Sequence, residues 1–237
     1  MTLIITARAR SHLVVTADGR CRTITNGFQK KTSDTMQKIF PLPNRGFAVA
    51  HHGENIIEGC KVKDIVEQFF SDDMRGIRIT SVSQIARIFS ERYGDSIRKT
   101  LKRITDSKLC GYLFLGFGTA INKPKIYEAF WEKQNVNEIV HGTKECGNLV
   151  LSGDAKKYIC RYTKEPVDSQ FNWENIYRRD VEYSKAFCNR LYQLAEDAQN
   201  KAGEDIFGGY KHQLVIEKSG CKWSIPPKQT DSTTAGQ

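Results

Sequence analysis

The protein has 237 residues, and its 36 Lys and Arg residues outnumber its 27 Asp and Glu residues, which gives a net charge of +9. Counted with Gly in place of Tyr, its apolar fraction is about 43%, which is typical of globular domains and excludes disordered and collagen-like chains. No apolar run approaches the roughly 18 residues of a membrane-spanning helix, and residues 1–20 contain no signal-peptide core. We therefore expect a soluble, cytoplasmic protein that does not enter the membrane.

The beginning of the chain has the pattern of β-structure. Two short runs of branched residues, 3–9 and 12–17, predict a pair of strands with a tight connection. Asp18 and Gly19 then form a turn signal, because Gly tolerates positive φ and Asp bonds its own backbone. A further strand is expected at 47–51, after several Pro and Gly residues.

The pattern then changes to the period of an amphipathic helix, with apolar residues at i, i+3 and i+4. Ser81, followed three residues later by Gln84, predicts a capping box at the start of a second helix. The apolar face of the first helix consists of Val62, Ile65, Val66, Phe69 and Phe70. The face of the second helix consists of Ile85, Phe89, Tyr93, Ile97 and Leu101. A third face, near the C-terminus, consists of Phe187, Leu191, Leu194, Ala195 and Ala198.

Strands return in the second half of the chain. They are expected at 112–117, 126–131, 148–151, 212–217 and 222–225. Ser219 and Gly220 predict a two-residue hairpin between the last two strands. Because the helices come in blocks rather than after every strand, we expect a layered α+β fold of antiparallel sheets with helices on both outer faces, not a doubly wound parallel sheet.

The seven cysteines are odd in number, widely spread and never within two residues of one another. This spacing provides neither a C-x-x-C metal knuckle nor a dense disulfide framework. We therefore expect free thiols in a reducing compartment. The residues are Cys21, Cys60, Cys110, Cys146, Cys160, Cys188 and Cys221.

The densest basic cluster lies on one face of the second predicted helix and consists of Arg98, Lys99, Lys102 and Arg103. No aromatic residues are interleaved with these charges, as they would be in a single-strand nucleic-acid platform. A solvated or subunit-contacting helix face is the favoured interpretation, and a nucleic-acid-binding domain is the alternative.

Motifs that would indicate a cofactor or metal are incomplete. The glycines at 116 and 118 lack the third Gly of a dinucleotide-binding turn, and the chain has no phosphate-binding loop of the form G-x-x-x-x-G-K-[ST]. His51 and His52 are adjacent on a predicted strand, so their side chains point to opposite faces and suit a shared metal poorly. We expect no cofactor and no metal.

One pattern in the sequence indicates a catalytic site, and it consists of Thr2, Asp18 and Lys38. Thr2 follows Met1 directly, and Met before a small residue is normally removed, which would give Thr2 a free α-amine. Together the three residues resemble the N-terminal threonine hydrolases, the β-subunits of the proteasome and their smaller bacterial relatives. In that family a strand pair leads from the first Thr to an Asp-x-Arg turn sixteen residues later, matched here by Asp18 and Arg20, and then to a Lys followed by an apolar residue.

Two further stretches extend the resemblance over nearly the whole chain. Residues 149–153 are similar to the apolar strand of the family that ends in Ser-Gly, which here are Ser152 and Gly153. Glu204 or Asp205, ahead of a Gly-Gly pair, is similar to the acid of the family's late turn. The resemblance implies a four-layer α-β-β-α sandwich of two antiparallel sheets, with residues 2–225 as one domain and 226–237 as a flexible polar tail.

The resemblance also implies the chemistry. A Thr hydroxyl is a poor nucleophile unless a base takes its proton, and an α-amine with a pKa of about 7.7–8.0 serves when Thr is the first residue. The ammonium of Lys38 would lower the pKa of that amine by like-charge repulsion, and Asp18 would keep Lys38 charged and oriented. Ser152 and the acid at 204 or 205 would hold the amine and relay its proton. Arg20 would belong to the substrate side of the site.

Two departures from the family pattern favour an alternative. The family has Gly where this chain has His51, the position whose backbone N–H we expect to bind the tetrahedral oxyanion. The relay Ser of the late turn is also missing. The alternative is therefore a catalytically inactive proteasome-like subunit that serves in assembly or binding.

The expected substrate is a peptide or protein, cleaved through an acyl-enzyme on Thr2. The resemblance implies a homo-oligomer, a ring in many relatives, with the nucleophiles inside a chamber. Because this chain has no nucleotide loop, unfolding of folded substrates would need a separate ATPase.

Overall fold

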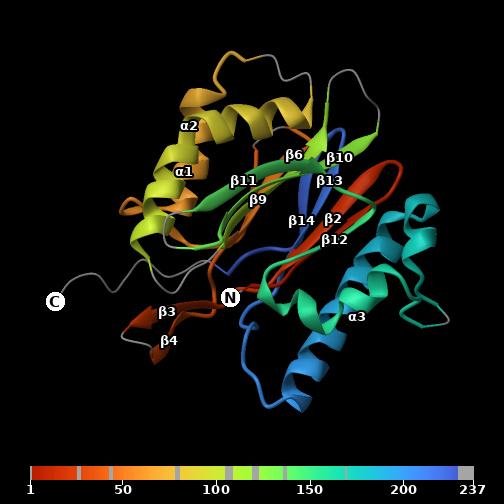
Figure 1. The fold of residues 1–237 in the computed structure, drawn as a ribbon. Helices are drawn as coiled ribbons and strands as arrows, with labels where there is room; N and C mark the ends of the chain where they lie inside the picture. Colours follow the sequence, from red (N-terminus) through yellow and green to blue (C-terminus); the bar gives the residue numbers. More distant parts are fainter. Residues whose placement is uncertain are drawn as a thin grey trace.

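The computed structural model of the protein describes residues 2–25, 28–42, 45–77, 81–104, 109–118, 123–135, 138–168 and 170–228, with the backbone alone for 22–25 and 28–32. Its main elements form four layers in the order helix, sheet, sheet, helix (Figure 1). Most of the predicted polar tail, residues 229–237, lies outside the described residues.

Two five-stranded antiparallel sheets form the inner layers. Across the first sheet the order is β12 (Leu149–Ser152), β1 (Ile4–Arg8), β2 (His12–Ala17), β13 (His212–Glu217) and β14 (Gly220–Ile225). Across the second sheet the order is β11 (Ile139–Glu145), β10 (Pro124–Lys133), β9 (Leu109–Phe117), β6 (Phe47–Gly53) and β5 (Ile39–Pro41). Two small ribbons pair β3 (Cys21–Thr25) with β4 (Phe28–Ser33) and β7 (Ile56–Ile57) with β8 (Cys60–Lys61).

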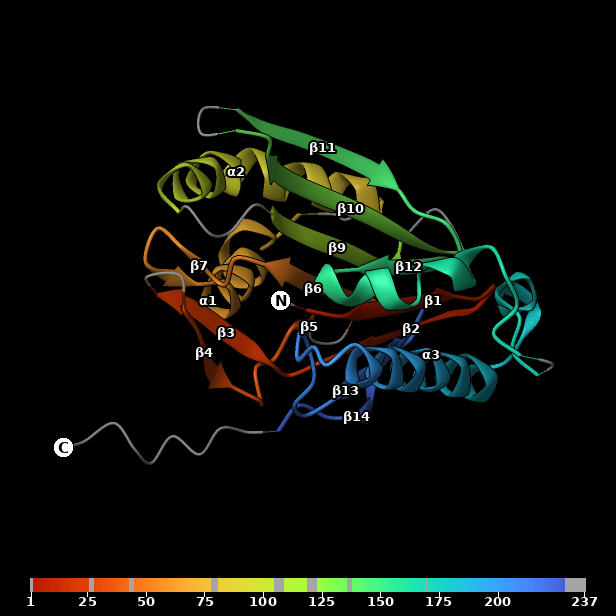
Figure 2. The same cartoon turned by 60° about the horizontal axis from the view of Figure 1, so that its bottom comes forward.

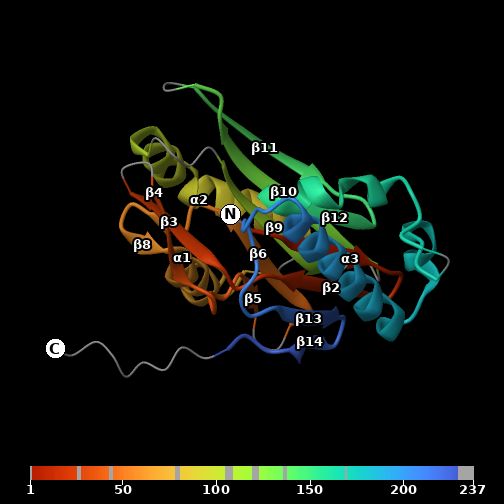
Figure 3. The ribbon, with the colours of Figure 1, turned by 90° about the horizontal axis from the view of Figure 1, so that it is seen from below.

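Helices cover the outer face of each sheet (Figure 2). The second sheet carries α1 (Val62–Gln68), its continuation as a π-helix (Phe69–Asp73), and α2 (Val82–Arg103). The first sheet carries α3 (Val181–Lys201), which lies beside β2 in Figure 3, and three short 3₁₀ helices. Their bounds are Asp154–Tyr158, Cys160–Thr163 and Trp173–Arg178.

The strand sequences explain this layering, because successive side chains of a strand point to opposite faces. In β2, Leu13 and Val15 pack between the two sheets, while Val14 packs against the α3 layer. In β6, the small residues Ala48 and Ala50 face the other sheet, and the intervening positions face α1 and α2. Both strands are therefore buried on two faces, which explains their nearly continuous apolar sequences. The predicted four-layer α+β sandwich is confirmed.

Both long helices begin at side-chain caps. Ser81 Oγ accepts a hydrogen bond from Gln84 N at 3.2 Å, so the predicted start of the second helix is confirmed. Asp180 caps α3 by accepting from Tyr183 N at 2.8 Å, seven residues before the first predicted apolar position of that helix, Phe187. The inward face of α2 is buried as predicted at Ile85, Phe89, Ile97 and Leu101, and Lys99, Lys102 and Arg103 are exposed.

The structure also differs from the expectation in detail. It adds β5, β11 and the two ribbons, which had not been expected. The last hairpin turns at Lys218 and Ser219, one residue earlier than predicted, because Gly220 already pairs with Glu217 and opens β14. Within the described ranges, no helix is long and apolar enough to cross a membrane. The seven cysteines are free thiols.

Candidate active site

Asp18, at the end of β2, is the hub of a buried polar cluster. Its side chain is fully buried and accepts four hydrogen bonds. Oδ1 accepts from Leu3 N and from Lys38 Nζ, both at 2.8 Å. Oδ2 accepts from Arg20 N at 3.2 Å and Gly208 N at 3.3 Å. A carboxylate offers about four acceptor sites, so these four donors saturate it.

Lys38, just before β5, is the buried cation of this cluster, with 1% of its side chain exposed. Nζ donates to Asp18 Oδ1 and, at 2.7 Å, to the carbonyl oxygen of Arg20. The main chain of Lys38 is held as well. Its N–H donates to His212 Nε2 at 3.1 Å, and its carbonyl oxygen accepts from His51 N at 2.9 Å. The lysine is therefore fixed by contacts from both sheets.

Thr2 lies at the same end of the sandwich, buried and two residues before the start of β1. Its neighbour Leu3 exchanges two hydrogen bonds with Asp18, since Leu3 also accepts from Asp18 N at 3.2 Å. On the other side, Gly153 has a φ of +87°, and a Cβ there would lie 2.2 Å from the carbonyl oxygen of Thr2. The buried Ser152 precedes that glycine, opposite Ile4 in the first sheet. The fold thus gathers Thr2, Asp18, Lys38 and Ser152 at one end of the sheets.

The two candidate late acids occupy different surroundings. Glu204 accepts from Lys157 Nζ and from the hydroxyl of Tyr158, both at 2.6 Å, on an exposed surface. Asp205 pairs with the guanidinium of Arg20, which connects it to the turn that carries Asp18. Arg20 also donates to Asp34 Oδ1 at 3.0 Å. Arg20 is therefore an anchor for acidic side chains, and Asp205 is the late acid that it connects to the Asp18 turn.

The turn before β13 contributes backbone atoms rather than a hydroxyl. Gly208 donates its N–H to Asp18 and accepts from Gly19 N at 3.1 Å. Gly209 has a φ of +73°, and a Cβ there would lie 2.6 Å from the carbonyl oxygen of Asp34. The two glycines thus allow a close backbone approach that a larger residue would prevent. Phe207 is buried in the α3 layer.

His51 is placed differently from the expected oxyanion position. Its N–H is engaged by the carbonyl oxygen of Lys38 within the sheet. Its ring lies on the helix side, with Nε2 3.8 Å from Cys110 Sγ and its centroid 4.8 Å from that of Tyr112. Burial, followed by the nearby His52 and Lys38, holds the pKa of His51 well below its usual range. In this structure the imidazole of His51 is a neutral side chain of the core, and its backbone N–H makes a hydrogen bond to Lys38, just before β5.

Sequence reasoning missed several contributors to the cluster. The backbone N–H groups of Leu3 and Gly208 and the imidazole of His212 bind Asp18 and Lys38 from distant segments. Burial lowers the pKa of His212 to about 4, so its Nε2 is free to accept from Lys38 N. No local motif marks these contacts. Among the described residues, no group of three His, Cys, Asp or Glu side chains is arranged to hold a metal ion.

The two antiparallel sheets between helical layers define the class of fold, a proteasome-like sandwich. A solved structure of an Anbu (Gly-1) mutant from Hyphomicrobium sp. strain MC1 has the same arrangement, with a TM-score of 0.56 and 13% sequence identity. The match covers 98% of this chain and 89% of that chain. At this identity the likeness shows the fold alone. No family model and no curated protein matches the sequence.

Proposed function

We propose that the protein hydrolyses peptide or amide bonds through an acyl-enzyme on Thr2, after removal of Met1. The observation that carries the proposal is the buried Lys38, held at the start of β1 by a carboxylate that also binds the N–H of Leu3. Taking a charged lysine out of water is costly unless it is fully paired. Lys38 shares Asp18 Oδ1 with Leu3, the residue that follows Thr2. A catalytic role for its charge at Thr2 explains why the fold keeps a buried lysine there.

In the proposed mechanism, the neutral α-amine of Thr2 takes the proton of its own hydroxyl as Oγ1 attacks the scissile carbonyl carbon. The ammonium of Lys38 disfavours protonation of the amine and so increases its basic fraction. The amine then returns the proton to the leaving nitrogen as the C–N bond breaks. Water, activated by the same amine, cleaves the ester. Ser152 and Asp205 are the proposed relay groups, with Glu204 as the alternative acid.

The test is turnover of fluorogenic peptides by protein whose intact mass shows that Met1 has been removed. Thr2→Ala and Lys38→Ala should each abolish turnover, and Thr2→Ser, which keeps a hydroxyl, should retain part of it. Lys99→Ala, an exposed lysine of α2, is the matched control and should leave the rate unchanged. Wild-type turnover in the Thr2→Ala variant would contradict the proposal.

A second candidate is a catalytically inactive subunit that acts in assembly or binding. The observation that favours it is the engaged N–H of His51, because a hydrolase of this kind needs a free backbone donor for the oxyanion. An epoxyketone or β-lactone warhead separates the two candidates. Modification at Thr2, detected by intact mass and peptide mapping, supports the hydrolase. An unmodified chain under conditions that label an active relative supports the inactive subunit.

We further propose that residues 2–225 act as one domain, that the chain assembles into a homo-oligomer, and that it works in the cytoplasm. The shared fold and the free cysteines support these proposals. A ring would present Thr2 to an inner chamber and would depend on a separate ATPase for folded substrates. Light scattering coupled to gel filtration measures the assembly, and a strictly monomeric protein would contradict the ring.

A further inference from the structure

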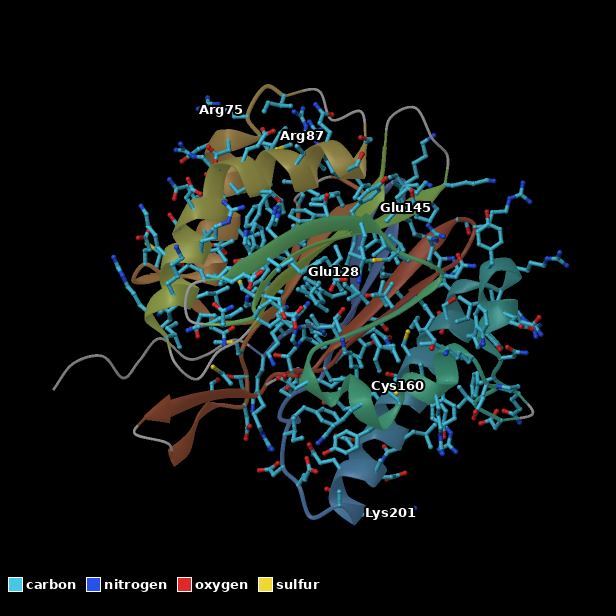
Figure 4. The ribbon with its side chains drawn as sticks, in the orientation of Figure 1. Arg75, Arg87, Glu128, Glu145, Cys160 and Lys201 are labelled. Carbon is cyan, nitrogen blue, oxygen red and sulfur yellow. The ribbon has the colours of Figure 1, made fainter. Side chains whose placement is uncertain are left out.

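A cavity of about 540 Å³ opens between the two sheets, beside Thr2. It lies where β10 and β11 of the second sheet face β12 of the first. Ser152 and Gly153 form its wall next to Thr2, since the backbone of Gly153 touches the carbonyl group of Thr2. In Figure 4, the labelled Glu128 lies near the middle of the molecule, whereas Arg75 and Arg87 project from the helical side. The proposed function uses only the Thr2 end of this cavity.

The wall formed by β10 is polar, although it faces the other sheet. Ala129 and Trp131 pack under α2, so the alternating positions Glu128, Phe130 and Glu132 point to the opposite side and line the cavity. Elsewhere the space between the sheets is filled by apolar residues such as those of β2. Within this wall Glu128 is largely withdrawn from solvent, with 13% of its side chain exposed, so its charge favours a polar occupant of the cavity.

His52 is the second unusual feature of this wall. It is 3% exposed, and among the described residues neither of its ring nitrogens makes a hydrogen bond. Nε2 lies 3.4 Å from Glu128 Oε1, longer than an ordinary N–H···O bond. Gly111 provides the space for the ring, because a Cβ there would lie 2.3 Å from Nε2. Buried polar atoms nearly always have partners, and among the described residues Nδ1 makes neither a hydrogen bond nor an ion pair, so His52 is only partly satisfied.

Glu128 supplies a negative charge inside the cavity. Burial alone would raise the pKa of Glu128, but its contacts with His52 and Lys144 outweigh burial and lower it to about 2. Lys144 Nζ lies 3.0 Å from Oε2, and its side chain is 61% exposed, so it reaches Glu128 from the solvent side. A carboxylate with two partners has room for further donors.

We propose that this cavity receives the substrate side chain on the leaving-group side of the scissile bond, and that Glu128 and His52 select a cationic side chain, lysine or arginine, at that position. The inference rests on the proposed function of Thr2. The N–H groups of such a side chain would donate to Glu128, whose Oε1 His52 contacts from the buried side. Glu132, exposed at the mouth, adds a second negative charge, while the cation Lys156 lies exposed in solvent. An acidic substrate side chain would meet like charge.

Internally quenched peptides that differ only in the residue after the scissile bond test the selection. We expect kcat/KM to favour arginine or lysine over leucine by roughly tenfold, the size of a charge-assisted hydrogen bond, and Glu128→Gln to abolish this preference. Glu138→Gln, an exposed glutamate outside the cavity, is the control and should retain the preference. An aminomethylcoumarin amide, which has no side chain beyond the scissile bond, should be cleaved equally by the wild type and by Glu138→Gln.

Binding gives a readout that does not depend on turnover. In the full-length Thr2→Ala variant, argininamide should shift the imidazole NMR signals of His52 in a saturable way, norleucinamide should not, and Glu128→Gln should remove the shift. Turnover without preference, or no shift with argininamide, overturns the cavity assignment. A specific shift together with no turnover of any substrate overturns the proposed hydrolase and leaves the cavity assignment standing.

Discussion

Two pairs of titratable side chains, one buried and one partly buried, lie at the same end of the sandwich and differ in how completely they are satisfied. Asp18 and Lys38 are 2.8 Å apart, and the carboxylate accepts four donors. His52 and Glu128 are 3.4 Å apart, and the imidazole has no hydrogen bond within the described part of the chain. The first pair is bonded mainly by backbone groups, whereas the second is bordered by a cavity.

The Asp18–Lys38 pair is therefore preorganised, with its hydrogen bonds already made. The His52–Glu128 pair is receptive, which here means that it can still bind a further polar group. A saturated buried ion pair is rigid and loses heavily when one partner is removed, because the other charge is left alone. An incompletely satisfied pair costs the folded state something already, so its removal should be tolerated far better. The predictions below follow from this contrast, in order of decreasing effect.

Asp18→Ala should be the most damaging change. It leaves the buried ammonium of Lys38 without its carboxylate. Breaking a buried ion pair in this way lowers the free energy of unfolding by about 3–5 kcal/mol. Urea unfolding followed by circular dichroism measures the loss. Glu128→Gln is the comparison variant in the receptive pair and should cost less than half as much. Equal losses in the two variants would show that the two pairs do not differ in the way described.

His212 should make the saturated region sensitive to acid, and the buried His51, whose pKa is also lowered, should add to the effect. The pKa of His212 is about 4 in the folded protein, against about 6.5 in the unfolded chain, because burial disfavours the charged ring. Below pH 6.5 the unfolded chain therefore binds a proton that the folded protein does not. The contribution of His212 to the free energy of unfolding is fully present above pH 6.5 and is lost as the pH drops towards 4. The loss reaches up to about 3 kcal/mol, at roughly 1.4 kcal/mol per pKa unit.

The variant His212→Gln, whose amide oxygen can still accept from Lys38 N, should flatten this part of the curve. Urea midpoints measured at several pH values between 7 and 4 give the comparison. Glu128 titrates in a lower window, below about pH 4.5, because its pKa is about 2. A variant with the wild-type slope between pH 6.5 and 4.5 would contradict the assignment.

Gly153→Ala should have an intermediate effect, because Gly153 touches both regions. A Cβ would clash with the backbone of Thr2, and the φ of +87° is strained for alanine, so we expect a loss of about 1–3 kcal/mol together with loss of Thr2-dependent turnover. Gly147→Ala is the matched control in the same cavity wall, where a Cβ meets nothing within 4 Å. Thermal unfolding of both variants decides whether the close approach to Thr2 matters.

The smallest effect should come from Glu204→Gln. Because this glutamate is an exposed partner of Lys157 and Tyr158, its removal should change turnover by less than about twofold and leave the unfolding midpoint unchanged. Asp205→Asn, which weakens the contact with Arg20, should reduce turnover more. A larger kinetic effect at 204 than at 205 would reverse our assignment of the relay acid.

Much of the sandwich could be predicted because its strands and helices carry local signals. β2 is buried along its whole length and has an apolar run at 13–15, and α2 combines a cap at Ser81 with an apolar face at 85–101. β11 escaped prediction because it is an edge strand with the polar sequence IVHGTKE, in which no residue is buried. β5 has three residues and is held by its pairing with β6 rather than by its own pattern.

For the candidate site, Thr2, Asp18 and Lys38 could be named from spacing, and the structure brings Asp18 and Lys38 into contact. The catalytic roles of all three stay predictions. The contacts of His212 and Gly208 join residues 174 and 190 positions apart, which no local pattern encodes. The occupied N–H of His51 was equally invisible, because it depends on how β5 and β6 align. The residue types in the sequence indicate which side chains belong to the site. The strand register and the path of the loops decide which of their atoms are left without a hydrogen bond.

The bonds of Lys38 have a consequence for the order of events during biosynthesis. Its main chain and side chain are held by groups from β6 in one sheet and from β13 and the end of β2 in the other. β13 follows Lys38 by 174 residues. A nascent or truncated chain that lacks β13 cannot complete this arrangement, so the poised lysine forms only after residues 212–217 have been made.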